Sequence, residues 1–217
     1  MSEQTVLRGL DAAVTRARSL VGASRGVLGI AGAPGAGKST LVDLLLDRLR
    51  SPAPDGADAE WVAHLPMDGF HLADTQLTRL GLLDRKGAPA TFDVDGYAAT
   101  LARLRDDPDR TVYAPGFERT LEQPIAAALA VTPAARLVVT EGNYLLLGRD
   151  GWERVRPHLD EVWFVESPTD RVARLVERHV AFGKSPEEAR AWVERVDEAN
   201  AALVERTRAA ADVVVSL

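Results

Sequence analysis

Hydrophobic and polar positions follow two alternating patterns along the chain. Short apolar runs, typical of buried strands, occur at residues 27–31, 61–67, 137–140, 162–165 and 213–215. Apolar residues recur at helical spacing over 39–50, 72–80, 95–105, 152–158, 169–179 and from Ser185 onward. A first helix is expected where the same spacing links Val6, Leu10, Ala13, Ala17 and Leu20. Strands that alternate with helices predict an α/β fold with a parallel central sheet flanked by helices in three layers.

The chain shows no internal repeat and no linker long enough to separate two domains. We therefore expect one domain over residues 1–217, at a length that suits a single large domain. A surface loop rich in proline, glycine and aspartate is expected at 51–59. A short strand at 111–113 should lead into an irregular stretch at 114–119.

A glycine-rich segment follows the first predicted strand and opens a helix. It fits the P-loop (Walker A) pattern G-x-x-x-x-G-K-[ST] with Gly32, Ala33, Pro34, Gly35, Ala36, Gly37, Lys38 and Ser39, followed by Thr40. Its amide groups and the helix N-terminus would hold phosphates. Lys38 should reach the β- and γ-phosphates, and the Ser39 hydroxyl should bind Mg²⁺. The alternative is a glycine-rich turn that binds nothing.

A GTPase would carry a guanine-reading N-K-x-D motif, which this sequence lacks. The D-x-x-G match at Asp93 to Gly96 opens an amphipathic helix, so helix capping explains it better.

Two acids follow predicted strands. Glu141 ends a buried strand, where Mg²⁺ bound to nucleotide needs a carboxylate nearby, and Asn143 should line the same crevice. Asp68 follows the second strand, where it is near the γ-phosphate if that strand neighbours the first, and would accept the proton of an attacking hydroxyl. The alternatives are a loop-capping acid at 141 and an ordinary Asp-Gly turn at 68.

The order of motifs resembles a known family. After the P-loop come M-D-G-F-H at 67–71, R-K-G-x-P-x-x-F-D from Arg85, V-Y-x-P-x-F-x-R from Val112 and E-G-N from Glu141. This order resembles the uridine kinase, phosphoribulokinase and bacterial pantothenate kinase superfamily, nearest to its small nucleoside and sugar kinase-like branch, over residues 27–215.

The resemblance implies a kinase that uses ATP and Mg²⁺ and phosphorylates a hydroxyl of a small molecule. It implies that Asp68 is the base and Glu141 the acid on the metal side. On the acceptor side it places Arg85, Lys86, Tyr113 and Arg119. Phe70 and His71, which follow Asp68, are further acceptor-side candidates. Aromatic residues at 70, 97, 117 and 144 would stack on a base or belong to the core.

The segment at 170–186 is expected to be a helical lid. Arg171, Arg174 and Arg178 share one helix face, and a cationic face beside a nucleotide site stabilises transferring phosphates. Arg178 is the preferred candidate to contact the transferred phosphoryl group, and Arg174 is the candidate to contact the nucleotide. A solvated arginine face is the alternative. His179 is expected to be a packed or surface histidine, and His64 and His158 are given no role.

The helix after the capping box Ser185 to Glu188 carries polar residues on its apolar stripe. Asn200 and Asp197 either hydrogen-bond internally or face the acceptor pocket. The family resemblance favours acceptor contact for Asn200.

Composition narrows the class further. There are no cysteines, which excludes disulfides, thiolate nucleophiles and zinc–cysteine sites. A net charge of −6 disfavours a nucleic-acid-binding face. No signal peptide or membrane-spanning run is evident, so we expect a cytoplasmic protein without a membrane partner. Only three basic residues are lysines, and Lys38, Lys86 and Lys184 all fall in segments selected above.

We therefore expect a kinase with ATP and Mg²⁺ as cofactors and a nucleoside, pantothenate-like or sugar acceptor. The alternatives are a P-loop ATPase or GTPase switch and a non-catalytic nucleotide-binding regulator. The oligomeric state is open, and a homodimer is one option.

Overall fold

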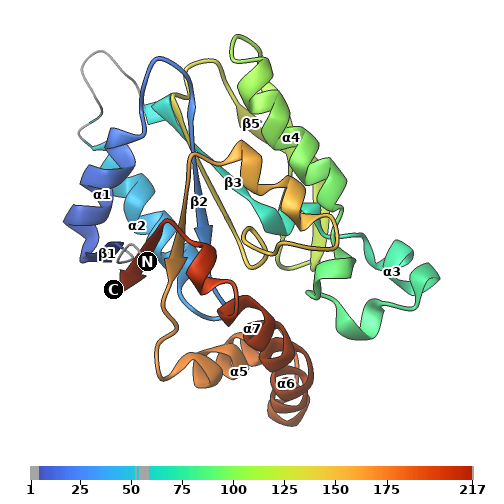
Figure 1. Ribbon diagram of the computed structural model, residues 1–217. Helices are drawn as coiled ribbons and strands as arrows, with labels where there is room; N and C mark the ends of the chain where they lie inside the picture. Colours follow the sequence, from blue (N-terminus) through green and yellow to red (C-terminus); the bar gives the residue numbers. More distant parts are fainter. Residues whose placement is uncertain (1–4, 52, 54–58, 217) are drawn as a thin grey trace.

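The computed structural model describes residues 5–51, 53 and 59–216, so most of the loop expected at 51–59 lies outside the described residues. Its centre is a six-stranded parallel sheet (Figure 1). The strand order is β1 (Thr5–Arg8), β8 (Val213–Ser216), β7 (Glu161–Val165), β2 (Gly26–Ala31), β6 (Leu137–Gly142) and β3 (Val62–Pro66).

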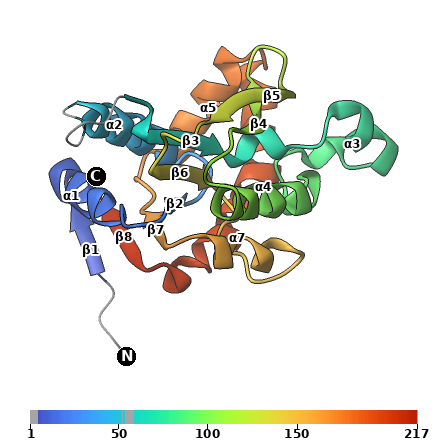
Figure 2. The ribbon, with the colours of Figure 1, turned by 90° about the horizontal axis from the view of Figure 1, so that it is seen from above.

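Helices cover both faces of this sheet (Figure 2). Helices α1 (Leu10–Ser19) and α2 (Lys38–Arg50) lie on one face, and α4 (Val94–Asp106) lies on the other. Strand β2 contributes side chains to the hydrophobic cores on both faces of the sheet, because successive side chains of a strand point to opposite faces. Leu28 and Ile30 pack towards α1 and α2, whereas Val27 and Ala31 pack towards α4. The prediction of a three-layer α/β fold is confirmed.

Two expected helices were wrong in part. Val6 belongs to β1, which pairs with β8 about two hundred residues later in the chain, and α1 begins only after Gly9. The segment at 152–158 forms two 3₁₀ turns, Trp152–Arg154 and Arg156–His158, instead of a helix. Pro157 has no amide hydrogen to donate within a longer helix, which explains the break.

A two-stranded antiparallel hairpin stands beside the main sheet. It consists of β4 (Val112–Glu118) and β5 (Gln123–Val131), so the prediction of an irregular stretch at 114–119 was wrong. A register shift between Ala114 and Gly116 accommodates Pro115, which has no amide hydrogen for the ladder.

The lid region consists of α5 (Arg171–Ala181), α6 (Pro186–Trp192) and α7 (Glu198–Glu205). The capping box at Ser185 is confirmed, because its Oγ accepts from the Glu188 amide at 3.3 Å. The long helix expected from Ser185 is interrupted by a π-helical turn at Val193–Asp197. A short helix, α3 (Asp74–Leu80), projects beside the hairpin. In the part of the chain that the structure describes, no helix has the length and apolar character needed to cross a membrane.

The sheet brings three site segments to one edge. The P-loop follows β2, Glu141 lies in β6, and Asp68 follows β3. Parallel strands end at the same edge, so their following residues gather there. Strand β6 lies between β3 and β2, so the condition set for Asp68, that its strand neighbours β2, is not met. Asp68 still faces the P-loop, because the 3₁₀ turn Met67–Phe70 follows β3 at this edge.

Candidate active site

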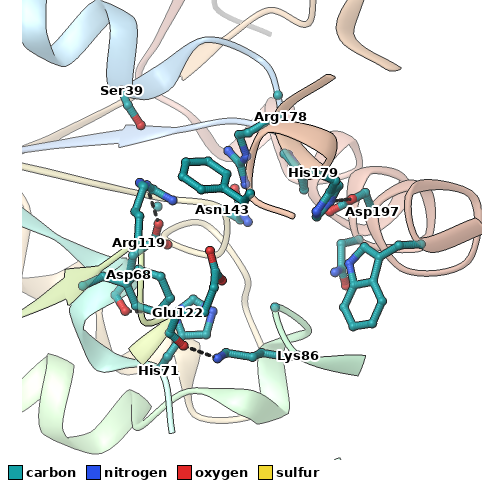
Figure 3. Close-up of a pocket in the computed structure, with 18 of the residues that line it drawn as sticks. Ser39, Asp68, His71, Lys86, Arg119, Glu122, Asn143, Arg178, His179 and Asp197 are labelled. Carbon is teal, nitrogen blue, oxygen red and sulfur yellow. Dashed lines mark hydrogen bonds and ion pairs between the residues drawn. The ribbon is translucent and has the colours of Figure 1, made fainter. Parts of the chain in front are cut away.

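A cavity of about 370 Å³ opens at the carboxyl edge of the sheet (Figure 3). Its walls come from the P-loop, the turn after β3, the β4–β5 hairpin, the end of β6 and the lid. It brings together most of the predicted site residues: Pro34, Gly35, Lys38, Ser39, Asp68, His71, Lys86, Arg119, Glu141, Asn143, Arg178 and Asn200. All three lysines of the chain line it.

The P-loop holds Lys38 at the inner end of this cavity. Gly37 adopts a φ of 94°, a conformation that favours glycine, and α2 begins at Lys38. The Lys38 Nζ donates hydrogen bonds to the Ala33 carbonyl at 3.1 Å and to Asn143 Oδ1 at 2.6 Å. Burial lowers the pKa of Lys38, although the charge of Glu141 opposes this shift. The ammonium is therefore held by two oxygen acceptors, one from the P-loop and one from the loop after β6.

Ser39 and Glu141 are joined by a hydrogen bond beside the P-loop. The Ser39 Oγ donates to Glu141 Oε1 at 3.1 Å, between the start of α2 and the end of β6. Burial raises the pKa of Glu141, and the charge of Asp68 raises it further. An accessible hydroxyl beside a buried carboxylate offers the hard oxygen ligands that Mg²⁺ prefers.

Asp68 is held in place by its neighbours on the hairpin. A side chain at Gly69 would lie 2.2 Å from the Pro115 carbonyl oxygen, so only glycine allows the turn to pack this closely on β4. The Asp68 Oδ2 accepts from Arg119 Nη2 at 3.2 Å. Burial by itself would raise the pKa of Asp68, but nearby positive charges outweigh burial and hold it below its ordinary value; they come from His71, Arg119, Lys38 and Arg178.

His71 lies beside Asp68 on the acceptor side. Its Nδ1 is 2.8 Å from the Asp68 carbonyl oxygen, and its ring packs 3.9 Å from Phe92 and 5.0 Å from Phe117 between centroids. Burial lowers the pKa of His71. Lys86 completes this wall and forms a 2.6 Å ion pair with Asp74.

The three lid arginines have three different surroundings, so their shared helix face is not one cationic surface. Arg171 donates to the Pro34 carbonyl and pairs with Glu198. Arg174 pairs with Asp170 at 2.8 Å and lines a second hollow. Arg178 lines the main cavity, and no acid of the described residues lies within ion-pairing distance of it.

The second hollow lies on the other side of the P-loop. Its lining contains Ala36, Gly37, Thr40 and Arg174 from the predicted nucleotide set, together with Ser167, Glu205 and Arg208. Gly32 and Ala33 are buried beneath the loop. The P-loop thus contributes residues to both spaces.

Three predicted acceptor residues do not line the cavity. Phe70 is buried in the core against Tyr97, at 4.9 Å between centroids. The Arg85 side chain is 57% exposed beside Asp84, and Tyr113 is exposed on the hairpin. Tyr97 and Tyr144 are also core residues, so Phe117 alone of the four aromatic candidates faces the cavity.

The lid contributes residues that the sequence did not assign to the site. His179 lines the cavity, and its Nε2 lies 2.8 Å from Asp197 Oδ2. Lys184 Nζ lies 5.0 Å from the Trp192 ring centroid, and both residues line the cavity. The π-helical turn ends at Asp197, and such turns are frequent at functional sites. The rarity of lysine was the one sequence signal for Lys184.

Comparison with known proteins gives consistent results. A Schizosaccharomyces pombe protein named "Putative uridine kinase C227.14" is 33% identical over 199 residues, which cover 88% of this chain and 83% of that protein. The "ATP-dependent kinase-like protein notR'" of Aspergillus versicolor is 37% identical over 133 residues, which cover 58% of this chain and 77% of that protein. No family model matches the chain.

A solved structure shares the whole fold. The "putative fructose transport system kinase" from Silicibacter sp. TM1040 superposes with a TM-score of 0.84 at 35% identity, covering 95% of this chain and 98% of that one. The parallel sheet and the P-loop define the class of P-loop kinases. Within that class, the chain belongs to the uridine-kinase-like family.

Proposed function

We propose that this protein transfers the γ-phosphoryl group of ATP to a hydroxyl group of a small molecule, with Mg²⁺ as the metal cofactor. The observation that carries the proposal is the shared cavity in which the P-loop residue Lys38 faces the carboxylate of Asp68. Phosphoryl transfer needs a phosphate clamp and a proton acceptor on opposite sides of the reacting atoms. The kinase names of relatives support the same reaction class.

The P-loop borders two spaces, and this suggests how ATP would lie across it. We infer that the nucleoside of ATP binds in the hollow beside Thr40 and Arg174, because this hollow meets the P-loop on the side away from Asp68. The phosphates then follow the loop amides into the cavity, where Lys38 meets the β- and γ-phosphates.

Ser39 and Glu141 are the residues that would hold Mg²⁺. Among the described residues, no group of three or more histidine, cysteine or acidic side chains is arranged to hold a metal ion. In kinases, Mg²⁺ is bound by one or two protein oxygens together with phosphate oxygens and waters. The metal would neutralise charge on the phosphates.

Asp68 is the proposed general base. Its lowered pKa keeps it ionised at neutral pH, so it accepts the proton of the acceptor hydroxyl as that oxygen attacks the γ-phosphorus. The bond from the γ-phosphorus to the bridging oxygen then breaks, and ADP leaves. Arg119 holds the Asp68 carboxylate, and Arg178 stabilises the charge of the transferred group.

A coupled ADP-release assay with MgATP tests this function. The panel contains uridine, D-ribose, D-fructose, D-glycerate and pantothenate, so that it includes a nucleoside, sugars and hydroxy acids. At least one acceptor should stimulate ADP formation, and Asp68→Asn should reduce that rate by about 10² to 10⁴-fold while ATP still binds. Equal ADP formation with and without every acceptor, or full activity of Asp68→Asn, would contradict the proposal.

A further inference from the structure

The turn between β4 and β5 places one residue in an unusual backbone conformation. Residues 119–122 form this turn, and Glu122 has a φ of 53°. Residues with a Cβ rarely adopt this left-handed region, and they persist there when the surrounding structure holds them. Such residues cluster at functional sites.

Three hydrogen bonds link the backbone around Glu122 to the start of α3. The Lys86 Nζ donates to the Glu122 carbonyl oxygen and also to Asp74 Oδ1. The Asp74 amide in turn donates to Gln123 Oε1 at 3.1 Å. The tip of the hairpin is therefore fixed to the start of α3 through the backbone of Glu122, which leaves its carboxylate uninvolved.

The Glu122 carboxylate points into the cavity (Figure 3). Among the described acids that line the cavity, it is the one whose carboxylate has neither a hydrogen bond nor an ion pair. The others are paired: Asp68 with Arg119, Asp74 with Lys86, Asp197 with His179, and Glu141 with Ser39. An unpaired carboxylate held in a binding cavity is available to a ligand.

The charges around Glu122 restrict that ligand. Lys86 and Arg119 are matched by Asp74 and Asp68, so Glu122 leaves this wall with a net negative charge. A carboxylate or phosphate on the acceptor would be repelled by that charge. Neutral hydroxyl groups suit this place, because a carboxylate accepts hydrogen bonds from two of them.

We propose that Glu122 binds hydroxyl groups of the acceptor adjacent to the one that is phosphorylated. The site thereby selects an uncharged polyhydroxylated acceptor, such as a sugar or the ribose of a nucleoside, over an anionic one. This inference rests on the proposed kinase function and adds a specificity residue to it. Phe117, which lines the same wall, offers an apolar face for the carbon skeleton of such an acceptor.

The test measures steady-state kinetics of Glu122→Gln with neutral acceptors (uridine, D-ribose, D-fructose) and anionic ones (D-glycerate, pantothenate, fructose 1-phosphate). The wild type should prefer a neutral acceptor. The variant should raise the KM for that acceptor about 10-fold or more, as expected for a lost hydrogen bond to a charged group, with the KM for ATP within twofold. Glu118→Gln, on the same hairpin but outside the cavity, is the matched control and should keep the wild-type KM.

A second variant separates recognition from structure. Glu122→Gly removes the carboxylate and suits the positive φ, so the melting temperature should hold or rise while the acceptor KM rises as for Glu122→Gln. A wild-type preference for anionic acceptors, or wild-type KM values in both variants, would overturn this inference alone. If no acceptor stimulates ADP formation, the proposed function fails, and this inference falls with it.

Discussion

The Nζ of Lys38 lies 2.6 Å from the Oδ1 of Asn143, and this contact joins the P-loop to the loop that follows β6. The same ammonium donates to the Ala33 carbonyl at 3.1 Å, so two oxygen acceptors fix the position of the side chain. Phosphate oxygens would replace neutral oxygens as its partners, with little rearrangement of the lysine.

Lys38→Arg should therefore be a damaging substitution despite the conserved charge. The lysine is 8% exposed, and a planar guanidinium cannot direct its donors as a compact ammonium does. We expect kcat/KM for ATP to fall about 100-fold or more in the coupled assay. Arg79→Lys on the exposed side of α3 is the control, and near wild-type activity of Lys38→Arg would contradict the assignment of Lys38.

Arg178→Ala and Arg174→Ala should have different kinetic effects. Arg178 lines the main cavity, so its loss should lower kcat by about 10² to 10³-fold, the size typical of a missing transition-state donor. Arg174 lines the second hollow, so its loss should raise the KM for ATP and leave kcat within a few-fold. Saturation curves in ATP measure kcat and KM for both variants. If both variants change kcat and KM in the same way, the assignment of Arg178 to the main cavity and of Arg174 to a separate nucleotide hollow is contradicted.

Removal of Mg²⁺ with EDTA should abolish turnover, and excess Mg²⁺ should restore it. Glu141→Gln should raise the Mg²⁺ concentration needed for half-maximal rate about 10-fold or more, because a neutral amide binds the ion more weakly than a carboxylate. A titration of rate against free Mg²⁺ measures this shift. An unchanged half-saturation point would exclude Glu141 from the metal site.

The pH profile should reflect Glu141 more than Asp68. Burial and the charge of Asp68 raise the pKa of Glu141, whereas the pKa of Asp68 is lowered, so Glu141 takes up a proton first as the pH falls. Because Mg²⁺ competes with that proton, the acid limb of kcat/KM should move to lower pH as Mg²⁺ increases. An acid limb whose pH position stays the same at every Mg²⁺ concentration would contradict this assignment.

His64 provides a separate test on stability. It lies on β3, its Nε2 is buried without a partner, and burial lowers its pKa to about 4. The unfolded chain takes up this proton near pH 6.5 but the folded chain only near 4, so stability falls as the pH drops through that window. His64→Phe should reduce this loss, by up to about 1.4 kcal/mol for each pH unit in the window. Urea denaturation at pH 7 and pH 5 measures it, and equal pH dependence would refute the assignment.

The sequence predicted those features that depend on local patterns. Strand periodicity, together with the rule that parallel strands end at the same edge, was enough to predict three features. These are the P-loop, Glu141 at the end of one strand and Asp68 after another. Strand β1 was missed because its partner β8 is about two hundred residues away, and no local signal reports that pairing.

The acceptor side was predicted less well. Arg85 and Tyr113 were placed there by family resemblance, yet neither side chain lines the cavity. Glu122 and Trp192 line it because a hairpin turn and a pair of lid helices point inward, and both geometries depend on tertiary packing. A register shift in the hairpin or a π-helical turn in the lid has no clear pattern in the sequence.

The grouping of all three lysines around one cavity has a practical consequence. Every ε-amino group of the chain lies in this cavity, whereas the surface cations are arginines, which acylating reagents leave unmodified. Among side chains, an amine-reactive label therefore modifies only those of this site. Labelling at Lys38 should report nucleotide occupancy, and labelling at Lys86 and Lys184 should report the acceptor side, so a single mass-spectrometric measurement can follow both substrates.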